Sequence, residues 1–328
     1  MKKFCLALLP LMMVVCLLQT GCNKSKKNMV EDKPVVTPPA FDVDSAFSYV
    51  KAQTDFGPRT LGSQAHDNCR DYLAAKLSEF CDTVHLQNFT AATYDGKKYP
   101  ACNVIGVFAP EKSERVVLAS HWDARPFADH DANPANRDQA IDGANDGASG
   151  VGVLLEVARQ LRQLNPNVGV DIVFFDAEDY GPKEGDESPN GEWWGLGSQY
   201  WARHFHTDNY TAKYGILLDM VGSADACFYQ ESFSMRDAQP VVAKVWAHAY
   251  DLGYGNYFIN SPGGTITDDH YYVNKYSNIP MIDIIHYDAA SGTGFDPVWH
   301  TMNDNIQHID KKMLGVVGTT LLQVIKNE

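Results

Sequence analysis

The sequence contains no Cys-X-X-Cys pair, and this absence argues against a zinc site built from thiolates. Its seven cysteines divide between the first 22 residues and the expected folded part, which holds Cys69, Cys81, Cys102 and Cys227. Cys69 and Cys81 flank one predicted helix at a separation of about three turns, which is too far for a disulfide across a continuous helix. Other pairings stay open in an oxidising compartment, because spacing alone does not decide between them.

Basic residues are too few to balance the acidic ones, with 27 Lys and Arg against 41 Asp and Glu and a formal net charge of −14. This excess of negative charge argues against a nucleic-acid partner and favours cationic or neutral ligands. The chain also lacks internal repeats, an internal linker and any second apolar run long enough to span a membrane. With 328 residues, 45% of them hydrophobic, it can bury a substantial core.

The N-terminus has the features of a secretory signal. Lys2 and Lys3 precede an apolar run from Phe4 to Leu18, which is followed by Gln-Thr-Gly-Cys22. Cys22 after Gly resembles the cleavage site of bacterial lipoproteins, where the cysteine becomes the lipidated first residue. A Gln stands three positions before Cys22 in place of the usual aliphatic residue, so a plain signal peptide or an uncleaved anchor are the alternatives.

Three regions are therefore expected. Residues 1–22 form a lipoprotein signal peptide, and residues 23–40, rich in Lys and Pro, form a flexible tether. Residues 41–328 form the catalytic domain. This organisation predicts an exported protein, anchored to a membrane through lipidated Cys22 on the periplasmic side or in the outer membrane.

A predicted strand that ends in three carboxylates is the most informative stretch of the chain. Residues 171–180 read Asp-Ile-Val-Phe-Phe-Asp-Ala-Glu-Asp-Tyr, and their apolar run is typical of a central parallel strand covered on both faces. Asp176, Glu178 and Asp179 follow at the end of the strand, where open α/β sheets bind ligands. Burying unpaired carboxylates is costly, so a bound cation or a reaction would explain them, whereas a solvated loop is the simpler alternative.

Strands and helices alternate along the rest of the chain. Helices are expected over 44–53, 64–80, 151–164, 238–250 and 309–326, with an aromatic-rich helix after Ser198. Strands are expected over 84–89, 103–108, 115–120, 214–222 and 279–286, and from residue 171. Asp95-Gly96 is a hairpin turn signal, and residues 267–270 are expected in a loop. This alternation predicts a single α/β domain with a mixed, mostly parallel twisted sheet and helices on both faces.

Several predicted strand ends and one helix start carry side chains that can bind a metal: His121, Asp123, Asp146, Glu178, Asp179 and Asp219, with His300 in a later loop. Each has an ordinary explanation on its own, such as a helix N-cap for Asp146. Neighbouring parallel strands end side by side, so these groups are expected to converge on one rim. Carboxylates and imidazole without cysteine suit a catalytic zinc ion with an open coordination position.

Four segments resemble the zinc aminopeptidase superfamily and occur in its order: His121-Trp-Asp, Gly143-Ala-Asn-Asp-Gly-Ala-Ser-Gly, Phe174-Phe-Asp-Ala-Glu-Asp and Leu218-Asp-Met-Val-Gly. Two more, Asp268-Asp-His and Val298-Trp-His-Thr-Met-Asn-Asp-Asn, are similar to the zinc-dependent, animal-type glutaminyl cyclases, which have bacterial relatives. Those enzymes convert N-terminal glutamine to pyroglutamate and release ammonia. The resemblance extends from about Phe56 to the C-terminus.

This resemblance implies a role for each matching residue. One zinc ion would be held by Asp146, Asp179 and His300. Glu178 would be the general acid/base, with Asp219 and Asp268 as a supporting acidic pair. The substrate pocket would be walled by Trp299 and by one of Trp193 and Trp194.

The residue types agree with that reaction. Zinc would polarise the γ-carbonyl of the substrate glutamine, and the substrate's own α-amine would attack it, so the enzyme needs no nucleophile. Glu178 would take the amine proton and return it to the departing ammonia. The expected substrates are peptides or proteins with N-terminal glutamine, and the expected assembly is a monomer.

The chain departs from the animal enzymes at three points. A polar insertion from Gly181 to Glu192 leaves open which of Trp193 and Trp194 walls the pocket. Asp283 stands where those enzymes align a histidine, and no cysteine lies near His121 or Asp146 to form their disulfide.

Two other functions compete with the cyclase. A two-zinc aminopeptidase would add His121 and Asp219 as ligands, with Asp146 bridging the ions. Trp299 and the pair Asp268-Asp269 favour the cyclase, because they suit a closed glutamine pocket. A surface lipoprotein that only binds peptide or carbohydrate is the third possibility, against which the general base Glu178 argues.

Overall fold

The computed structural model describes Met1, residues 40–187 and residues 190–328. The expected signal peptide, the lipidated Cys22 and the tether up to residue 39 lie outside the described residues. The chain from residue 40 onward forms one compact unit. Among the described helices, none combines the length and the apolar character needed to cross a membrane.

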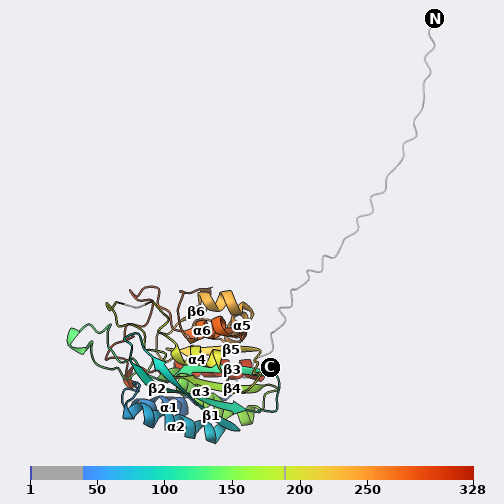
Figure 1. The fold of residues 1–328 in the computed structure, drawn as a ribbon. Coiled ribbons are helices and arrows are strands. Elements are labelled where there is room, and N and C mark those ends of the chain that lie inside the picture. Colours follow the sequence, from blue (N-terminus) through green and yellow to red (C-terminus); the bar gives the residue numbers. More distant parts are fainter. Residues whose placement is uncertain (2–39, 188–189) are drawn as a thin grey trace. The chain divides into compact units, whose positions relative to one another are not determined.

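A six-stranded sheet forms the centre of the domain (Figure 1). Its strands, in spatial order, are β1 (Thr83–Ala92), β2 (Lys98–Phe108), β4 (Gly169–Phe175), β3 (Arg115–His121), β5 (Tyr214–Asp219) and β8 (Met281–Ile285). The β1–β2 and β2–β4 pairs are antiparallel, and the other three pairs are parallel. The predicted mixed, mostly parallel α/β sheet is therefore confirmed, and β3, β4, β5 and β8 all end at the same edge.

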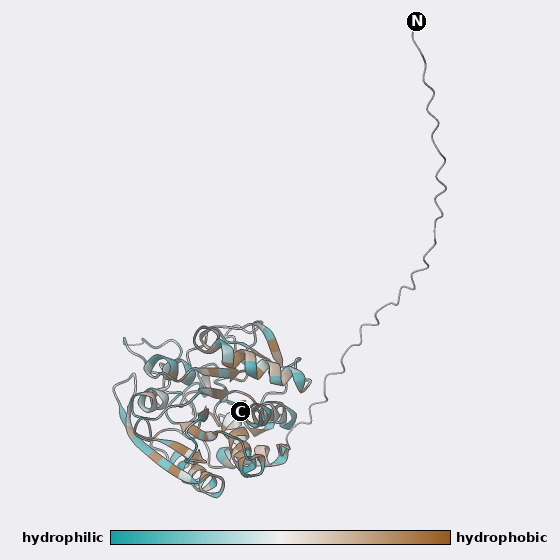
Figure 2. Ribbon diagram, turned by 90° about the vertical axis from the view of Figure 1, so that its right-hand side faces the viewer, coloured by the Kyte–Doolittle hydropathy of each residue, from teal (hydrophilic) through white to brown (hydrophobic). Residues whose placement is uncertain are grey.

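Helices cover both faces of this sheet. One face packs against α1 (Val43–Thr54), α2 (Gln64–Phe80), α3 (Ala148–Leu164) and α7 (Lys311–Lys326), and the other against α4 (Leu196–Arg203) and α6 (Asp269–Tyr276). Strand β3 shows the alternation, since Val116 and Leu118 join the first core and Val117 and Ala119 the second. Hydrophobic residues accordingly gather in the interior (Figure 2).

Helix α3 approaches the sheet closely because its first turn contains glycine. A β-carbon on Gly150 would lie 2.6 Å from the carbonyl oxygen of Leu218 in β5. Any larger residue would push α3 away from the strand ends, because backbone atoms cannot yield as a flexible side chain does. The turn that precedes α3 carries Asp146, so this glycine sets how near Asp146 lies to the sheet edge.

Two elements differ from the sequence-based expectation. The loop expected over residues 267–270 is instead the start of α6, because the side chain of Asp268 caps the helix at the N–H of Asp269. Helix α5 (Ser232–Asp251) begins six residues before its expected start, since Glu231 caps it and Pro240 is accommodated by a kink at Ala238.

A small parallel sheet was not anticipated. It pairs β6 (Phe228–Gln230) with β7 (Phe258–Pro262), and the N-cap of α5 follows β6 directly. Such short strands carry too little periodicity to be recognised in the sequence.

Candidate active site

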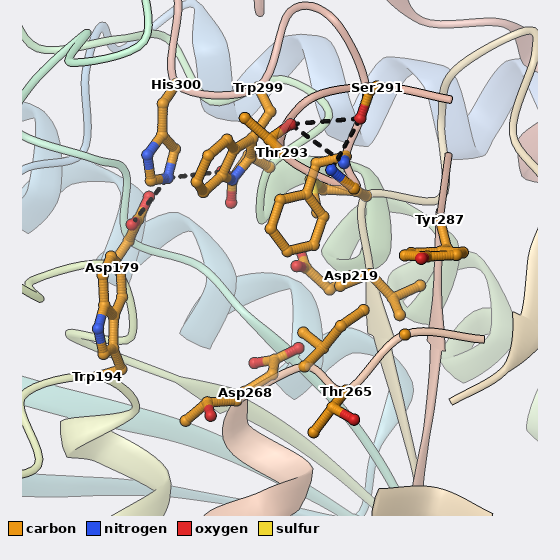
Figure 3. A pocket seen from close by; sticks show the side chains of 18 of the residues that line it. Asp179, Trp194, Asp219, Thr265, Asp268, Tyr287, Ser291, Thr293, Trp299 and His300 are labelled. Carbon is orange, nitrogen blue, oxygen red and sulfur yellow. Dashed lines mark hydrogen bonds and ion pairs between the residues drawn. The ribbon is translucent and has the colours of Figure 1, made fainter. Parts of the chain in front are cut away.

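A cavity of about 590 Å³ opens at the edge where the parallel strands end. Figure 3 shows Asp179 facing His300, with Trp194 and Trp299 beside them and Asp268 projecting into the same space. Of the nine residues that the motifs implied for the site, eight line this cavity: Asp146, Glu178, Asp179, Trp194, Asp219, Asp268, Trp299 and His300. Trp193 lines a neighbouring cavity of about 490 Å³ instead.

Asp146, Asp179 and His300 converge on one point of the cavity. The Nε2 atom of His300 lies 3.2 Å from Asp179 Oδ1 and 3.6 Å from Asp146 Oδ2. All three side chains are buried, and neither carboxylate oxygen of Asp179 accepts a well-formed hydrogen bond from the described residues, although His300 Nε2 and Arg125 Nη1 lie 3.2 and 3.6 Å from its Oδ1. Buried carboxylate oxygens without donors need a cation, and two carboxylates with one imidazole are a common zinc donor set. These residues therefore fit a zinc ion.

The ring of His300 is oriented by a carboxylate on its other side. Its Nδ1 atom lies 3.2 Å from Asp129 Oδ1, and Arg125 in turn binds Asp129 with an Nη2–Oδ2 distance of 2.6 Å. This contact fixes the tautomer and directs Nε2 toward Asp179, as partners of metal-bound histidines do. Burial lowers the pKa of His300, but the charge of Asp179 and the hydrogen bond with Asp129 outweigh it and raise that pKa to about 9.

Neither Asp129 nor Arg125 was anticipated as part of the site. Both lie in the long polar loop between β3 and α3, away from any strand end, and no periodicity marks them. The only available signal was the adjacency of Asp129 and His130 in that loop.

A second set of ligand-type residues adjoins the first and shares Asp146 with it. His121 Nε2 lies 3.0 Å from Asp146 Oδ1 and 3.3 Å from Asp219 Oδ1, and its Nδ1 lies 3.4 Å from Asp123 Oδ1. The ligand atoms of His121, Asp146 and Asp219 are close enough together to hold an ion as well. Geometry alone therefore permits either one or two metal ions.

Two buried carboxylates hold the backbone of the candidate ligands. Asp123 accepts hydrogen bonds from the N–H groups of Glu178 and Asp179 at 3.0 and 3.1 Å. Asp304 does the same for Asn145 and Asp146 at 2.7 and 3.1 Å. Hydrogen bonds to a charged acceptor are strong, so each carboxylate fixes the direction of the neighbouring side chains. Asp123, which the sequence suggested as a metal-competent group, thus turns its oxygens to the backbone.

Backbone conformation at the site is strained in three places. Ala177, Met220 and His300 have φ values of 57°, 48° and 54°, in the left-handed region that side chains disfavour. Ala177 precedes Glu178, and Met220 follows Asp219. Strain of this kind costs on the order of 1–3 kcal/mol per residue and is characteristic of functional sites.

Glu178 lies beside the ligand Asp179 and is only 8% exposed. Burial and the charge of Asp268 raise the pKa of Glu178 well above its ordinary value. Burial and the charge of Asp219 likewise raise the pKa of Asp268 to about 6. A carboxyl group with raised proton affinity is suited to accept a proton and return it during one reaction.

Aromatic rings close the cavity around His300. The Trp299 ring stacks on His300 with centroids 3.7 Å apart, and the Trp194 ring lies 6.4 Å from His300 and nearly parallel to it. The guanidinium group of Arg125 lies over the ring of Trp194, 4.9 Å from its centroid. The wall is completed by the segments 264–267 and 289–295, which the sequence did not mark because they read as ordinary loops.

An α/β sheet with a buried carboxylate–imidazole centre at its carboxyl edge places the chain among zinc-dependent enzymes of the aminopeptidase-like class. Residues 103–325 match the sequence profile of peptidase family M28. The chain belongs to this family.

Solved and curated relatives agree with that assignment. The chain is 52% identical to a Zn-dependent exopeptidase from Parabacteroides distasonis and 49% identical to a glutaminyl cyclase from Bacteroides thetaiotaomicron bound to N-acetylhistamine. Each match covers 89% of this chain and 100% of the other, with a TM-score of 0.87. It is also 25% identical over 280 residues to the glutaminyl-peptide cyclotransferase of Drosophila melanogaster, covering 77% of this chain and 72% of that one. The resemblance to glutaminyl cyclases inferred from the motifs is therefore confirmed.

Proposed function

We propose that this chain is a zinc-dependent glutaminyl-peptide cyclotransferase, which converts N-terminal glutamine of peptides or proteins to pyroglutamate and releases ammonia. The observation that carries the proposal is the placement of Glu178 and Asp268 in one cavity with the candidate metal-ligand group and two tryptophans. An acid pair beside a metal suits intramolecular attack by an amine. The similarity to glutaminyl cyclases supports the same reaction.

In this mechanism Asp146, Asp179 and His300 hold zinc, which when bound supplies a Lewis acid that polarises the γ-carbonyl of the substrate glutamine. Asp219 and Asp268 bind the α-amino group and orient it toward that carbonyl. A bond forms between the α-nitrogen and the γ-carbonyl carbon, and the bond from this carbon to the side-chain nitrogen breaks. No enzyme nucleophile is needed, because both reacting groups belong to the substrate.

Glu178 moves the proton. It accepts a proton from the α-amine as the ring closes and returns it to the departing nitrogen, which leaves as ammonia. Trp194 and Trp299 exclude water from the same cavity, so cyclisation competes well against hydrolysis.

We propose one zinc ion per chain. The Nε2 atom of His121 already lies between Asp146 and Asp219, and a protonated imidazole there supplies the positive charge that a second ion would bring. The competing function is a two-zinc exopeptidase, favoured by the second ligand group of His121, Asp146 and Asp219 and by the exopeptidase relative.

Metal analysis and two substrates distinguish these functions. The purified holoprotein is analysed for its zinc content per chain. It is then assayed for ammonia release from a peptide with N-terminal glutamine and for hydrolysis of leucine anilide. We expect about one zinc and ammonia release without leucine-anilide hydrolysis. Two zinc ions together with leucine release would identify an exopeptidase.

We also propose that the chain is exported, lipidated at Cys22 and held at a membrane as a monomer. The basic–apolar–cysteine order of residues 2–22 supports lipidation. Labelling cells with a fatty-acid analogue should mark the wild type and not Cys22→Ser, which should also leave the membrane fraction. Light scattering of the soluble domain should give the mass of one chain.

A further inference from the structure

A third buried group of titratable side chains adjoins the catalytic cavity and shares Asp268 with it. Ligand-type atoms of Asp268, His270 and Asp283 lie within 4.8 Å of one another, and all three residues are buried. Asp268 lines the cavity, whereas His270 and Asp283 do not. Asp283 belongs to β8, and the other two belong to α6 and its cap.

The carboxyl group of Asp283 has no source of stabilisation as an anion. Its accessible surface is 0%, and no donor of the described residues reaches either of its oxygens. The Nδ1 atom of His270 lies 3.6 Å from Asp283 Oδ2, beyond hydrogen-bond distance. The charged groups that face it are Glu231 from the cap of α5, Asp268 and His270 from α6, and Asp219 from β5.

Three of those four neighbours are carboxylates, so an ionised Asp283 would be both desolvated and repelled. Burial and the charges of Asp268, Asp219 and Glu231 accordingly raise the pKa of Asp283 well above its ordinary value. These surroundings favour the neutral carboxylic acid form of Asp283, whose O–H group needs an acceptor.

Glu231 determines which acceptors are available. It receives hydrogen bonds from the N–H groups of Phe233, Ser234 and Ile266, and its Oε2 lies 2.9 Å from His270 Nε2. Burial raises the pKa of Glu231, but the hydrogen bond with His270 outweighs it and lowers that pKa to about 2. Glu231 is thus an anion, and His270 Nε2 carries the hydrogen that binds it.

Two atoms beside Asp283 lack any donor of the described residues, and these are His270 Nδ1 and Asp268 Oδ2. The other oxygen of Asp268 accepts from the N–H of Asp269. Carboxyl oxygens of Asp268 and Asp283 lie within 4.8 Å of each other, and Asp268 is among the groups that raise the pKa of Asp283. A single proton on Asp283 therefore satisfies the otherwise unpaired oxygen of the residue that lines the cavity.

We propose that Asp283 is held as a neutral carboxylic acid that donates a hydrogen bond to Asp268 and so positions this carboxylate, in its ionised form, for the α-amino group of the substrate. The inference rests on the proposed function. Asp283 does not touch the substrate and acts only through Asp268. A donor to a carboxylate favours its ionised form, so Asp283 works against the burial that raises the proton affinity of Asp268.

A resident metal ion is the competing occupant of the same group, since two carboxylates and an imidazole can bind one. Such an ion would occupy the oxygens of Asp268, which must itself bind the α-amino group of the substrate. The proposed function therefore favours the proton, and the experiment distinguishes the two.

The test compares Asp283→Leu, which removes the donor and keeps the branching of the side chain, with Asp283→Asn, whose amide N–H₂ restores a donor that cannot ionise. We expect Asp283→Leu to lose roughly 10- to 100-fold in kcat/KM near neutral pH, the range for a hydrogen bond to a charged group. The acid limb of its kcat/KM profile should move to higher pH by about one unit, because Asp268 then holds its proton more tightly. Asp283→Asn should rescue most of the activity and the profile.

Two measurements do not depend on activity. Infrared difference spectra should show one protonated carboxylic acid fewer in Asp283→Asn than in the wild type at neutral pH, even where Asp283→Leu does not fold. Metal content should be equal in the wild type and Asp283→Asn.

Three results would overturn the proposal: an Asn variant as impaired as the Leu variant, an unchanged infrared spectrum, or the loss of one metal ion per chain in Asp283→Asn. If the wild type releases no ammonia from glutamine-led peptides, the proposed function fails, while the infrared comparison still decides the protonation of Asp283.

Discussion

In the proposed mechanism two adjacent residues at the end of β4 have different tasks, because the backbone turns between strand and site. Ala177 has a φ of 57°, and the N–H groups of Glu178 and Asp179 are both held by Asp123. Asp179 faces His300, whereas Glu178 lies against the charge of Asp268. Because both are carboxylates, their surroundings decide the difference. At Asp179 burial is outweighed by His300 and Arg125, which lower its pKa. At Glu178 burial and the charge of Asp268 raise the pKa.

Replacing Glu178 by Gln should remove the proton transfer while keeping the shape of the side chain. We expect kcat for ammonia release to fall roughly 10²- to 10⁴-fold, the usual contribution of a general acid/base, with zinc content unchanged. Steady-state kinetics and metal analysis measure both quantities. Glu111→Gln, at an exposed position between β2 and β3, is the matched control. Full turnover by Glu178→Gln would refute its role as proton carrier.

Asp129 should control metal affinity without touching the metal. Asp129→Asn keeps the size of the side chain but loses the charge that orients His300 through Nδ1. We expect zinc affinity to fall about 10- to 100-fold, as for other partners of metal-bound histidines. Competition with a chelator measures it, and Asp138→Asn in the same loop, which pairs only with surface Lys183, is the control. Equal affinities in both variants would contradict this role.

The site residues lie at the ends of strands and helices. Strand β3 ends at His121, β4 ends just before residues Asp176–Asp179, and β5 ends at Asp219. Helix α6 follows its N-cap residue Asp268. The N-cap of α5, Glu231, serves both its own helix and His270 of α6. One carboxylate therefore links the stability of α5 to the geometry behind the cavity.

Protein stability should depend on pH through Glu231. Its pKa is about 2 in the folded chain and 4.5 as its ordinary value, a difference that corresponds to about 3 kcal/mol. Because the folded pKa is depressed, this stabilisation is fully present above pH 4.5 and is lost as the pH falls toward 2. Glu231→Gln should lower the free energy of unfolding at pH 7 by up to that amount.

The difference between the wild type and Glu231→Gln should shrink steadily as the pH is lowered below about 4.5, as measured by denaturant unfolding at several pH values. Asp310→Asn, which alters the N-cap of α7 without a buried histidine partner, is the control. A constant difference between the wild type and Glu231→Gln across this range would show that ionisation of Glu231 does not contribute.

At the scale of the whole molecule, the proposed zinc ion joins distant parts of the chain. Asp146 precedes α3, Asp179 follows β4 and His300 lies near the C-terminal helix α7. A ligand that binds only the folded state stabilises it, so chelation should lower the melting temperature as well as abolish activity. Calorimetry before and after chelation measures this, and adding zinc back should restore both. A chelated protein with unchanged activity would exclude zinc from the reaction.

Much of the fold could be predicted because its signals are local. The helix over residues 64–80 was predicted with its observed bounds, and the apolar run of β4 identified a central strand. The start of α6 could not be predicted, because the sequence around Asp268 and Asp269 is as polar as that of an ordinary loop. The capping hydrogen bond from the N–H of Asp269 to Asp268 is visible only in the structure. Short β6 and β7 pair only through tertiary contacts and carry no pattern of their own.

The amino-acid sequence by itself determined the class of fold and the chemical types at the strand ends, because periodicity and residue type are local properties. It also supplied the motifs by which the family was anticipated. Only the tertiary structure decided that Trp194 lines the main cavity while Trp193 faces the next one, and that Asp129 and Asp304 orient the ligands. The proposed proton on Asp283 is also a feature that only the tertiary structure decides, because it depends on the groups that surround this buried carboxyl.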